Sequence, residues 1–194
     1  MSIKLKVLLL SILGPTLLAI LVFAYAMQSI WKSEEEAVLQ SARGIVSMAE
    51  SARQEMALKF NGVIKPLDEI SRDKLVDAVP IITAIKMARQ NASKLGYRFR
   101  VPKYSPRNPE NTTNELEKTA LDKIKSQGLT ELVVRQPDAI HYFKPIALTA
   151  ECMYCHGDPK GAPDPIGGIK EGWKEGEIHG AFEIIYSLDD AVKR

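Results

Sequence analysis

The sequence predicts an exported α+β domain, in which helices come first and an antiparallel sheet follows. An uncharged apolar run at residues 7–31 predicts a membrane segment or export signal. Apolar side chains recur at helical spacing over residues 33–60. After Gly96 the chain changes to short runs of β-forming residues separated by turn-rich loops, an order typical of α+β proteins.

The apolar run at residues 7–31 is long enough to cross a membrane, since a spanning helix needs roughly 20 apolar residues. Lys4 and Lys6 precede the run, and the acidic residues 34–36 follow it. This charge asymmetry predicts that residues 1–6 lie in the cytoplasm and residues 32–194 in the periplasm. The expected protein is therefore single-pass in the inner membrane.

A cleaved signal peptide is the alternative, because Ala24-Tyr25-Ala26 has the A-x-A form of a signal-peptidase site. Either interpretation exports the rest of the chain. That part has roughly 160 residues, enough for one domain with a core. The 26 basic and 24 acidic residues are well mixed, so we expect no nucleic-acid surface.

Three helical segments are expected in the exported part. The first covers residues 33–60, where Ser33 and Glu36 form a capping box, and continues from the membrane segment. The second covers residues 71–95, opened by Ser71 and Asp73, interrupted by Pro80 and closed by Gly96. The third covers residues 114–128 and ends at Gly128. Strands are expected at residues 97–101, 131–135, 140–146 and 177–186.

The two cysteines of the chain, Cys152 and Cys155, stand three residues apart, and His156 follows directly. C-x-x-C-H is the attachment signature of c-type haem. The two thiols add to the vinyl groups on one edge of the porphyrin, and the histidine supplies an axial imidazole to the iron. The sequence thus predicts one covalent haem c.

Other interpretations of the cysteine pair are a disulfide or thioredoxin-like redox pair and a zinc site. A redox pair normally comes early in a βαβ unit, whereas this pair comes late in the chain. Zinc would need further ligands, for which His141 and His179 have no finger-like spacing. Haem attachment also requires export, which the N-terminal segment predicts independently.

Three segments resemble the c-type haem sensor domains with a PAS-like fold that occur in bacterial methyl-accepting chemotaxis proteins and sensor kinases. They are GYRFRVPKYSPRNPEN, HYFKPIALTAECMYCHGDPKG and GGIKEGWKEGEIHGAFEII, and the resemblance runs from about Ala42 to Leu188. It implies a PAS-like antiparallel sheet, a long N-terminal helix, and haem between them. Such receptors carry a second span and an output module, and the sequence leaves open whether this chain belongs to a longer receptor.

The sixth iron ligand is not specified by the motif. The resemblance implies a ligand from the long helix, or water, opposite His156. We expect Met56, with Met48, Met87 and His141 as alternatives.

Several further residues are expected near the haem. Arg98, Arg100 and Arg107 are candidates to pair with the propionates, because a guanidinium matches a carboxylate. Tyr142 and Trp173 are expected to pack on the haem side, and His179 is expected at the surface.

The predicted function is a periplasmic haem sensor that responds to redox state or to NO, CO or O₂ and signals through its long helix. A homodimer is expected through the same helix. The alternative is a membrane-anchored electron-transfer cytochrome. An enzyme ranks lowest, since a single haem with an internal sixth ligand leaves no evident substrate position.

Overall fold

The structure, a computed structural model, describes residues 3–63 and 79–188. Residues 1–41 and 42–194 form two compact units, which we describe separately. The helices are α1 (Ile3–Val63), α3 (Pro80–Lys94), α4 (Glu115–Gln127) and the short α5 (Met153–His156). The strands are β1 (Tyr97–Arg100), β2 (Leu132–Arg135), β3 (Ala139–Ala147) and β4 (Ile178–Ser187), and 3₁₀ turns lie at Pro109–Asn111 and Ala150–Cys152.

The first unit consists of the N-terminal part of α1. Its apolar side chains, such as Leu17, Leu21 and Phe23, are exposed. By length and composition α1 could cross a membrane, with a mean hydropathy of 2.6 over its most apolar window, and it is the one such helix in the described part of the chain. A membrane span and a signal sequence both have these properties.

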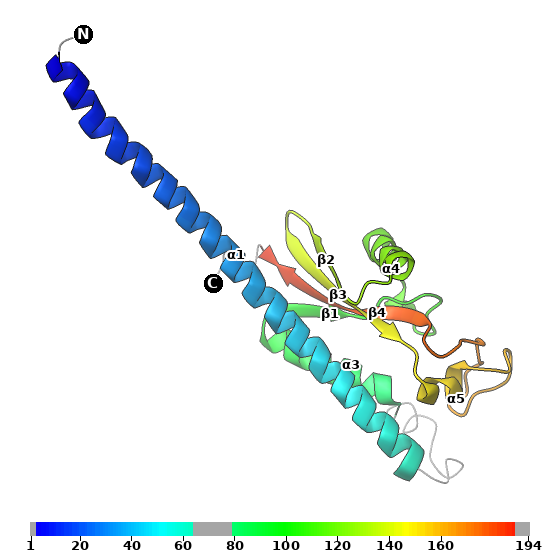
Figure 1. Cartoon of the computed structure of the whole chain (residues 1–194). Coiled ribbons are helices and arrows are strands. Elements are labelled where there is room, and N and C mark those ends of the chain that lie inside the picture. The colour runs from blue at the N-terminus through cyan, green and yellow to red at the C-terminus, as the bar shows by residue number, and fades with distance from the viewer. Residues whose placement is uncertain (1–2, 64–78, 189–194) are drawn as a thin grey trace. The chain divides into compact units, whose positions relative to one another are not determined.

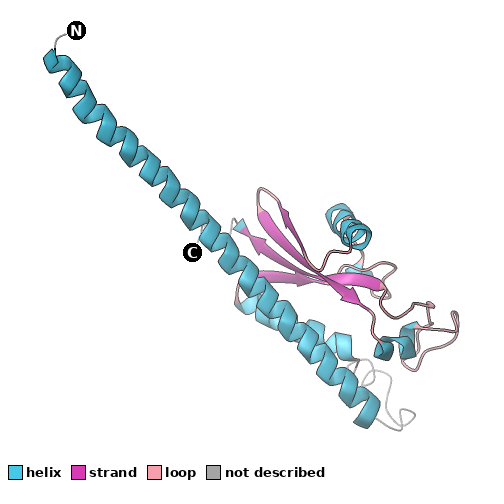
Figure 2. Cartoon of the chain, viewed as in Figure 1, coloured by secondary structure: helices cyan, strands magenta, loops and turns pink. Residues whose placement is uncertain are grey.

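The second unit is built on a four-stranded antiparallel sheet with strand order β1-β4-β3-β2 (Figure 2). The longest pairing joins β3 and β4, where Phe143 lies opposite Glu183 and Tyr142 opposite Ile184. This sheet confirms the predicted α+β class and its antiparallel strands.

Helix α4 covers one face of the sheet (Figure 1). Asn114 and Glu117 form a capping box at its start, and Gly128 ends it in the left-handed conformation at φ 62°. Leu121 and Ile124 are fully buried against β3 and β4. The predicted helix at residues 114–128 is thus confirmed.

Helix α3 and the part of α1 after residue 41 lie toward the opposite face (Figure 1). Ile45, Val46 and Ala49 of α1 are buried, as are Ala84 and Ala88 of α3. Arg43 joins α1 to the start of β2 through a 2.9 Å ion pair with Glu131.

The helix boundaries differ from those expected. Helix α1 runs past Asn61-Gly62 to Val63. Pro80 opens α3 rather than interrupting it, because proline is well tolerated in the first helical turn, where its missing N–H would have no partner. Ser71 and Asp73, the expected start of this helix, lie outside the described residues.

Candidate haem-attachment site

The cysteine motif folds as a 3₁₀ turn followed at once by one turn of α-helix, α5. Positions i, i+3 and i+4 of a helical turn share a face, so Cys152, Cys155 and His156 point to the same side. Gly157 ends the turn, and a side chain there would lie 2.7 Å from the Met153 carbonyl oxygen. Local sequence therefore gathers the two thiols and the imidazole.

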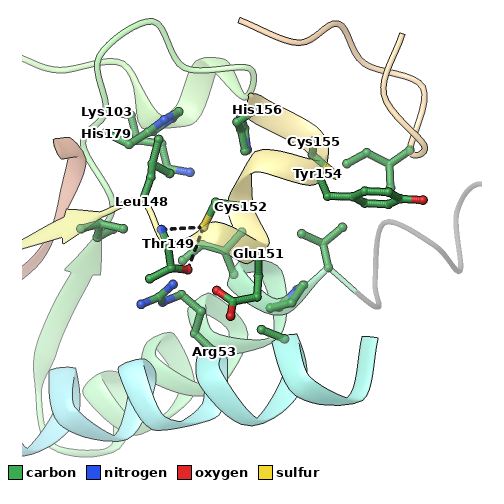
Figure 3. A pocket seen from close by; sticks show the side chains of 16 residues that line it. Arg53, Lys103, Leu148, Thr149, Glu151, Cys152, Tyr154, Cys155, His156 and His179 are labelled. Carbon is green, nitrogen blue, oxygen red and sulfur yellow. Dashed lines mark hydrogen bonds between the residues drawn. The ribbon is translucent and has the colours of Figure 1, made fainter. Parts of the chain in front are cut away.

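These three side chains line a cavity with about 840 Å³ of unfilled space, including space open to solvent (Figure 3). Its walls are mostly apolar and come from α1, the start of α3, the end of β3, the motif and the start of β4. The lining also includes Arg53, Lys103, Ile146, Leu148 and His179.

The two cysteines are free thiols. Burial raises the pKa of Cys155 to about 11, so its thiol is protonated at neutral pH. A redox-active or metal-binding cysteine needs thiolate character, and this environment opposes it. Among residues 3–63 and 79–188, no group of three His, Cys, Asp or Glu side chains is placed to hold a metal ion.

His156 is held by a carboxylate behind its ring. Its Nδ1 lies 2.8 Å from Glu171 Oε2. Burial lowers the pKa of His156, which favours the neutral imidazole. When Nδ1–H donates a hydrogen bond to Glu171, Nε2 is the nitrogen whose lone pair can bind a metal. This arrangement is usual for metal-ligating histidines.

Arg107 fixes Glu171 in turn. Its guanidinium donates to Glu171 at 2.5 and 2.9 Å, to Asp164 at 2.5 Å and to the Cys155 carbonyl at 2.9 Å. Burial disfavours the charged form of Glu171, but the hydrogen bonds from Arg107 and His156 prevail and lower the pKa of its carboxyl. Arg107 therefore ties the motif to the loop that follows it.

Trp173 adds a backbone contact to the same histidine. The amides of Gly172 and Trp173 donate to the His156 carbonyl at 3.1 and 2.9 Å. The Trp173 ring lies 5.1 Å from that of His179. Trp173 therefore lies beside the motif, and its packing on the haem stays a prediction.

His179 is not at the surface, and that expectation is wrong. Its side chain is 5% exposed, and its ring lies 5.2 Å from that of His156. Strand β4 begins at Ile178, which places His179 at the cavity end of a central strand. Burial lowers the pKa of His179 to about 3, so the ring is neutral.

Five predicted haem contacts do not line the cavity: Arg98, Arg100, Arg107, Tyr142 and Trp173. Arg98 is exposed on β1. Arg100 donates to the buried Glu117 at 2.5 Å, and the Tyr142 hydroxyl donates to Glu131 at 3.0 Å. Arg107 contacts the motif, but its guanidinium is committed to the chain's own carboxylates.

Of the candidate sixth ligands, Met56 is half-buried on α1, while the α1 side chains that line the cavity are Arg53 and Ala57. Met48 and Met87 are 51% and 45% exposed. His141 is engaged by Glu183, with Nδ1 2.8 Å from its carboxylate. Met56 stays a prediction.

Glu171, Asp164, Lys103 and Arg53 were not expected at this site. Glu171 lies within GGIKEGWKEGEIHGAFEII, one of the segments that carry the family resemblance, so its place there was the available signal. The other three are brought in by contacts between distant parts of the chain.

Fold and site together define an α+β domain with a C-x-x-C-H turn at an apolar cavity. The chain matches the family described as Tll0287-like over residues 31–187. It therefore belongs to the Tll0287-like family.

Among solved structures, the chain is similar to the "Crystal structure of the cyanobacterial heme-protein Tll0287". The two share 21% sequence identity, and the match covers 77% of this chain and 94% of that one with a TM-score of 0.60. This likeness shows the fold. No curated protein matches the chain.

Proposed function

We propose that the second unit carries one covalently attached haem c in this cavity and acts as a sensor of redox state or of a small ligand such as NO, CO or O₂. The observation that carries the proposal is the placement of Cys152, Cys155 and His156 on one wall of a single apolar cavity. The solved relative is by its title a heme-protein, which agrees with this assignment.

The residues present fit the group chemically. Each thiol of Cys152 and Cys155 would add across a vinyl group, its sulfur bonding to one carbon and its proton passing to the other, so no electrons are gained or lost. A protonated thiol is the species this addition consumes, and burial keeps the Cys155 thiol in that form by raising its pKa. When bound, haem supplies an iron that changes oxidation state and accepts a sixth ligand.

The chain's own residues would orient the iron-binding nitrogen and exclude water. Glu171 holds the Nδ1 proton of His156, which directs Nε2 into the cavity and makes the imidazole a stronger donor. Arg107 keeps Glu171 in place. Ile146 and Leu148 supply apolar wall on which a porphyrin can pack.

Signalling would pass through α1. Arg53 and Ala57 belong to that helix and line the cavity, so a change on the distal side of the haem would act on it directly. We further propose Met56 as sixth ligand, a PAS-like domain in the periplasm, residues 7–31 as an inner-membrane anchor, and a homodimer formed through α1. The proposed role is non-catalytic.

Absorption spectra of the oxidised and reduced holoprotein, with and without NO, test this function. A sensor should change its coordination when reduced or when NO is added. A haem that stays six-coordinate with the same ligands in every state would instead indicate an electron carrier.

A further inference from the structure

The cavity contains a cation and a buried nitrogen that have no partner within the described chain. Lys103 and His179 both line it, and Figure 3 shows them next to each other. His179 is 5% exposed, and its Nδ1 has no hydrogen-bond partner among the described residues. Burying such a group unpaired is unfavourable, so a partner for it is expected.

The backbone holds these two side chains together. The Tyr104 amide donates to the His179 carbonyl at 3.0 Å, and Lys103 pairs with Gly180 as an antiparallel bridge. A side chain at Gly180 would lie 2.4 Å from the Pro102 carbonyl oxygen, so glycine permits this close approach. The main chain of Lys103 is thereby held beside that of His179, and both side chains line the cavity.

The charge around Lys103 favours an anion. Among residues 3–63 and 79–188, no ion pair includes Lys103, although burial disfavours its charge and lowers its pKa. Arg53 is a second cation on the lining, and the exposed Glu151 is the one carboxylate among the described lining residues. Glu171, whose charge acts on Lys103, is already held by Arg107 and His156.

We infer that Lys103 and His179 form a carboxylate-binding site, in which the Lys103 ammonium pairs with one propionate of the haem and the Nδ1–H of His179 donates to it. This inference rests on the proposed function, because the carboxylate comes from the attached haem. A carboxylate has two oxygens, which matches one cationic and one neutral donor. The inference replaces Arg98, Arg100 and Arg107 as propionate partners with two residues that line the cavity.

The test uses holoprotein whose haem carries ¹³C at the propionate carboxyls, studied by redox-difference infrared spectroscopy. In the natural protein the label should identify an ionised, hydrogen-bonded carboxylate band. Lys103→Met and His179→Phe should each shift that band, and Lys103→Met should also lower the midpoint potential because a cation near the iron is lost.

Matched variants separate binding from general effects. Lys103→Arg and His179→Asn keep a cation and a donor in place and should retain most of the natural band position. Lys160→Met removes one positive charge from an exposed position in the same region and should leave the band unchanged.

A ¹³C-sensitive band that is the same in the natural protein, Lys103→Met and His179→Phe would overturn the inference. If Lys103→Met does not fold, the comparison of His179→Phe with His179→Asn decides it alone. Protein without haem absorption would contradict the proposed function instead, so the two failures are distinguishable.

Discussion

Strand β4 carries two buried titratable side chains whose surroundings differ. Glu183 lies under α4, where His141 Nδ1 is 2.8 Å and Arg100 Nε is 3.8 Å from its carboxylate oxygens. Burial raises the pKa of Glu183 to about 6. His179, four residues earlier, has ring neighbours but no hydrogen bond at Nδ1 among the described residues.

The charged groups around Glu183 are paired within the chain, whereas donors at the cavity are not. We therefore expect the first group to stabilise the fold and the second to bind a ligand. Under α4 the chain supplies both charges, since Arg100 also pairs with the buried Glu117 at 2.5 Å. Glu183 Oε2 has this cation 3.8 Å away, although it has no hydrogen bond among the described residues. At the cavity the chain supplies donors without acceptors: His179, Lys103 and Arg53, whose buried Nε has no partner among the described residues. Natural proteins seldom leave buried donors unpaired, so we expect a bound group to complete the cavity.

The largest effect is expected when that outside group is removed. Cys152→Ala combined with Cys155→Ala should abolish covalent haem and leave a void between helix and sheet. A domain has about 5–15 kcal/mol of stability, and we expect the Tm to fall by about 10 °C or more. Thermal unfolding followed by circular dichroism measures this.

Tyr154→Phe is the matched control, since it alters the motif between the cysteines without removing a thiol. The double variant should differ sharply from it. Equal melting of the natural protein, Tyr154→Phe and the double variant would show that the cavity needs no bound group for stability.

Glu171→Gln sharpens the comparison, because Glu171 belongs to both kinds of group. It is paired within the chain, and its carboxylate also contacts the cavity residue His156. The carbonyl oxygen of glutamine can still accept a hydrogen bond from the Nδ1–H of His156. It lacks the negative charge that favours ferric iron. The midpoint potential should rise by about 60 mV, which is a tenfold change in a one-electron equilibrium.

Protein-film voltammetry at one pH and salt concentration gives this potential. Glu175→Gln removes the same charge from an exposed position nearby and should cause a much smaller rise. Identical shifts in the two variants would argue against a special role for Glu171.

Glu183→Gln tests the region under α4. The pKa of Glu183 in the folded protein, about 6, is above its ordinary value of 4.5. Its contribution to stability is therefore complete below pH 4.5 and is lost as the pH rises through about 6. The surrounding groups are His141 on β3, Arg100 on β1 and Glu117 on α4.

Glutamine imitates the protonated acid, so the variant should be more stable than the natural protein by about 1–2 kcal/mol at pH 7.5 and equal to it at pH 4.5. Urea unfolding at the two pH values measures the difference. A variant less stable at pH 7.5 would mean that the Glu183 charge is stabilising, contrary to this account.

The smallest structural effect is expected from Met56→Ala. If Met56 ligates the iron, the ferric protein should show a weak thioether band near ~695 nm that this variant loses. Met48→Ala and Met87→Ala, at exposed positions, should keep the band. Absence of the band in every form, with free binding of cyanide, would indicate water or a vacant position.

Much of the second unit follows from local sequence. The capping box of Asn114 and Glu117, the glycine at 128 and the runs of β-forming residues in β3 and β4 are short-range signals, and all were predictable. The motif residues were predictable too, because their C-x-x-C-H spacing is a known attachment signature. The α5 turn itself was not expected.

Long-range pairing was not predictable. Arg107 and Glu171 are 64 positions apart. Only the folded chain shows that Arg107 donates to Glu171, in the loop that follows the motif. Likewise, the burial of His179 depends on where β4 begins beside residues 102–104. The contact partners of an arginine or a histidine cannot be read from a single sequence.

The central claim is that the cavity holds one haem bound through Cys152 and Cys155. Intact-mass spectrometry of denatured protein, produced by an exporting host with haem-ligation machinery, tests it most directly. The account predicts a mass above that of the 21.5 kDa polypeptide by one haem, with pigment that resists acid-acetone extraction. A colourless protein at the unmodified mass, or one with stoichiometric zinc, would contradict it.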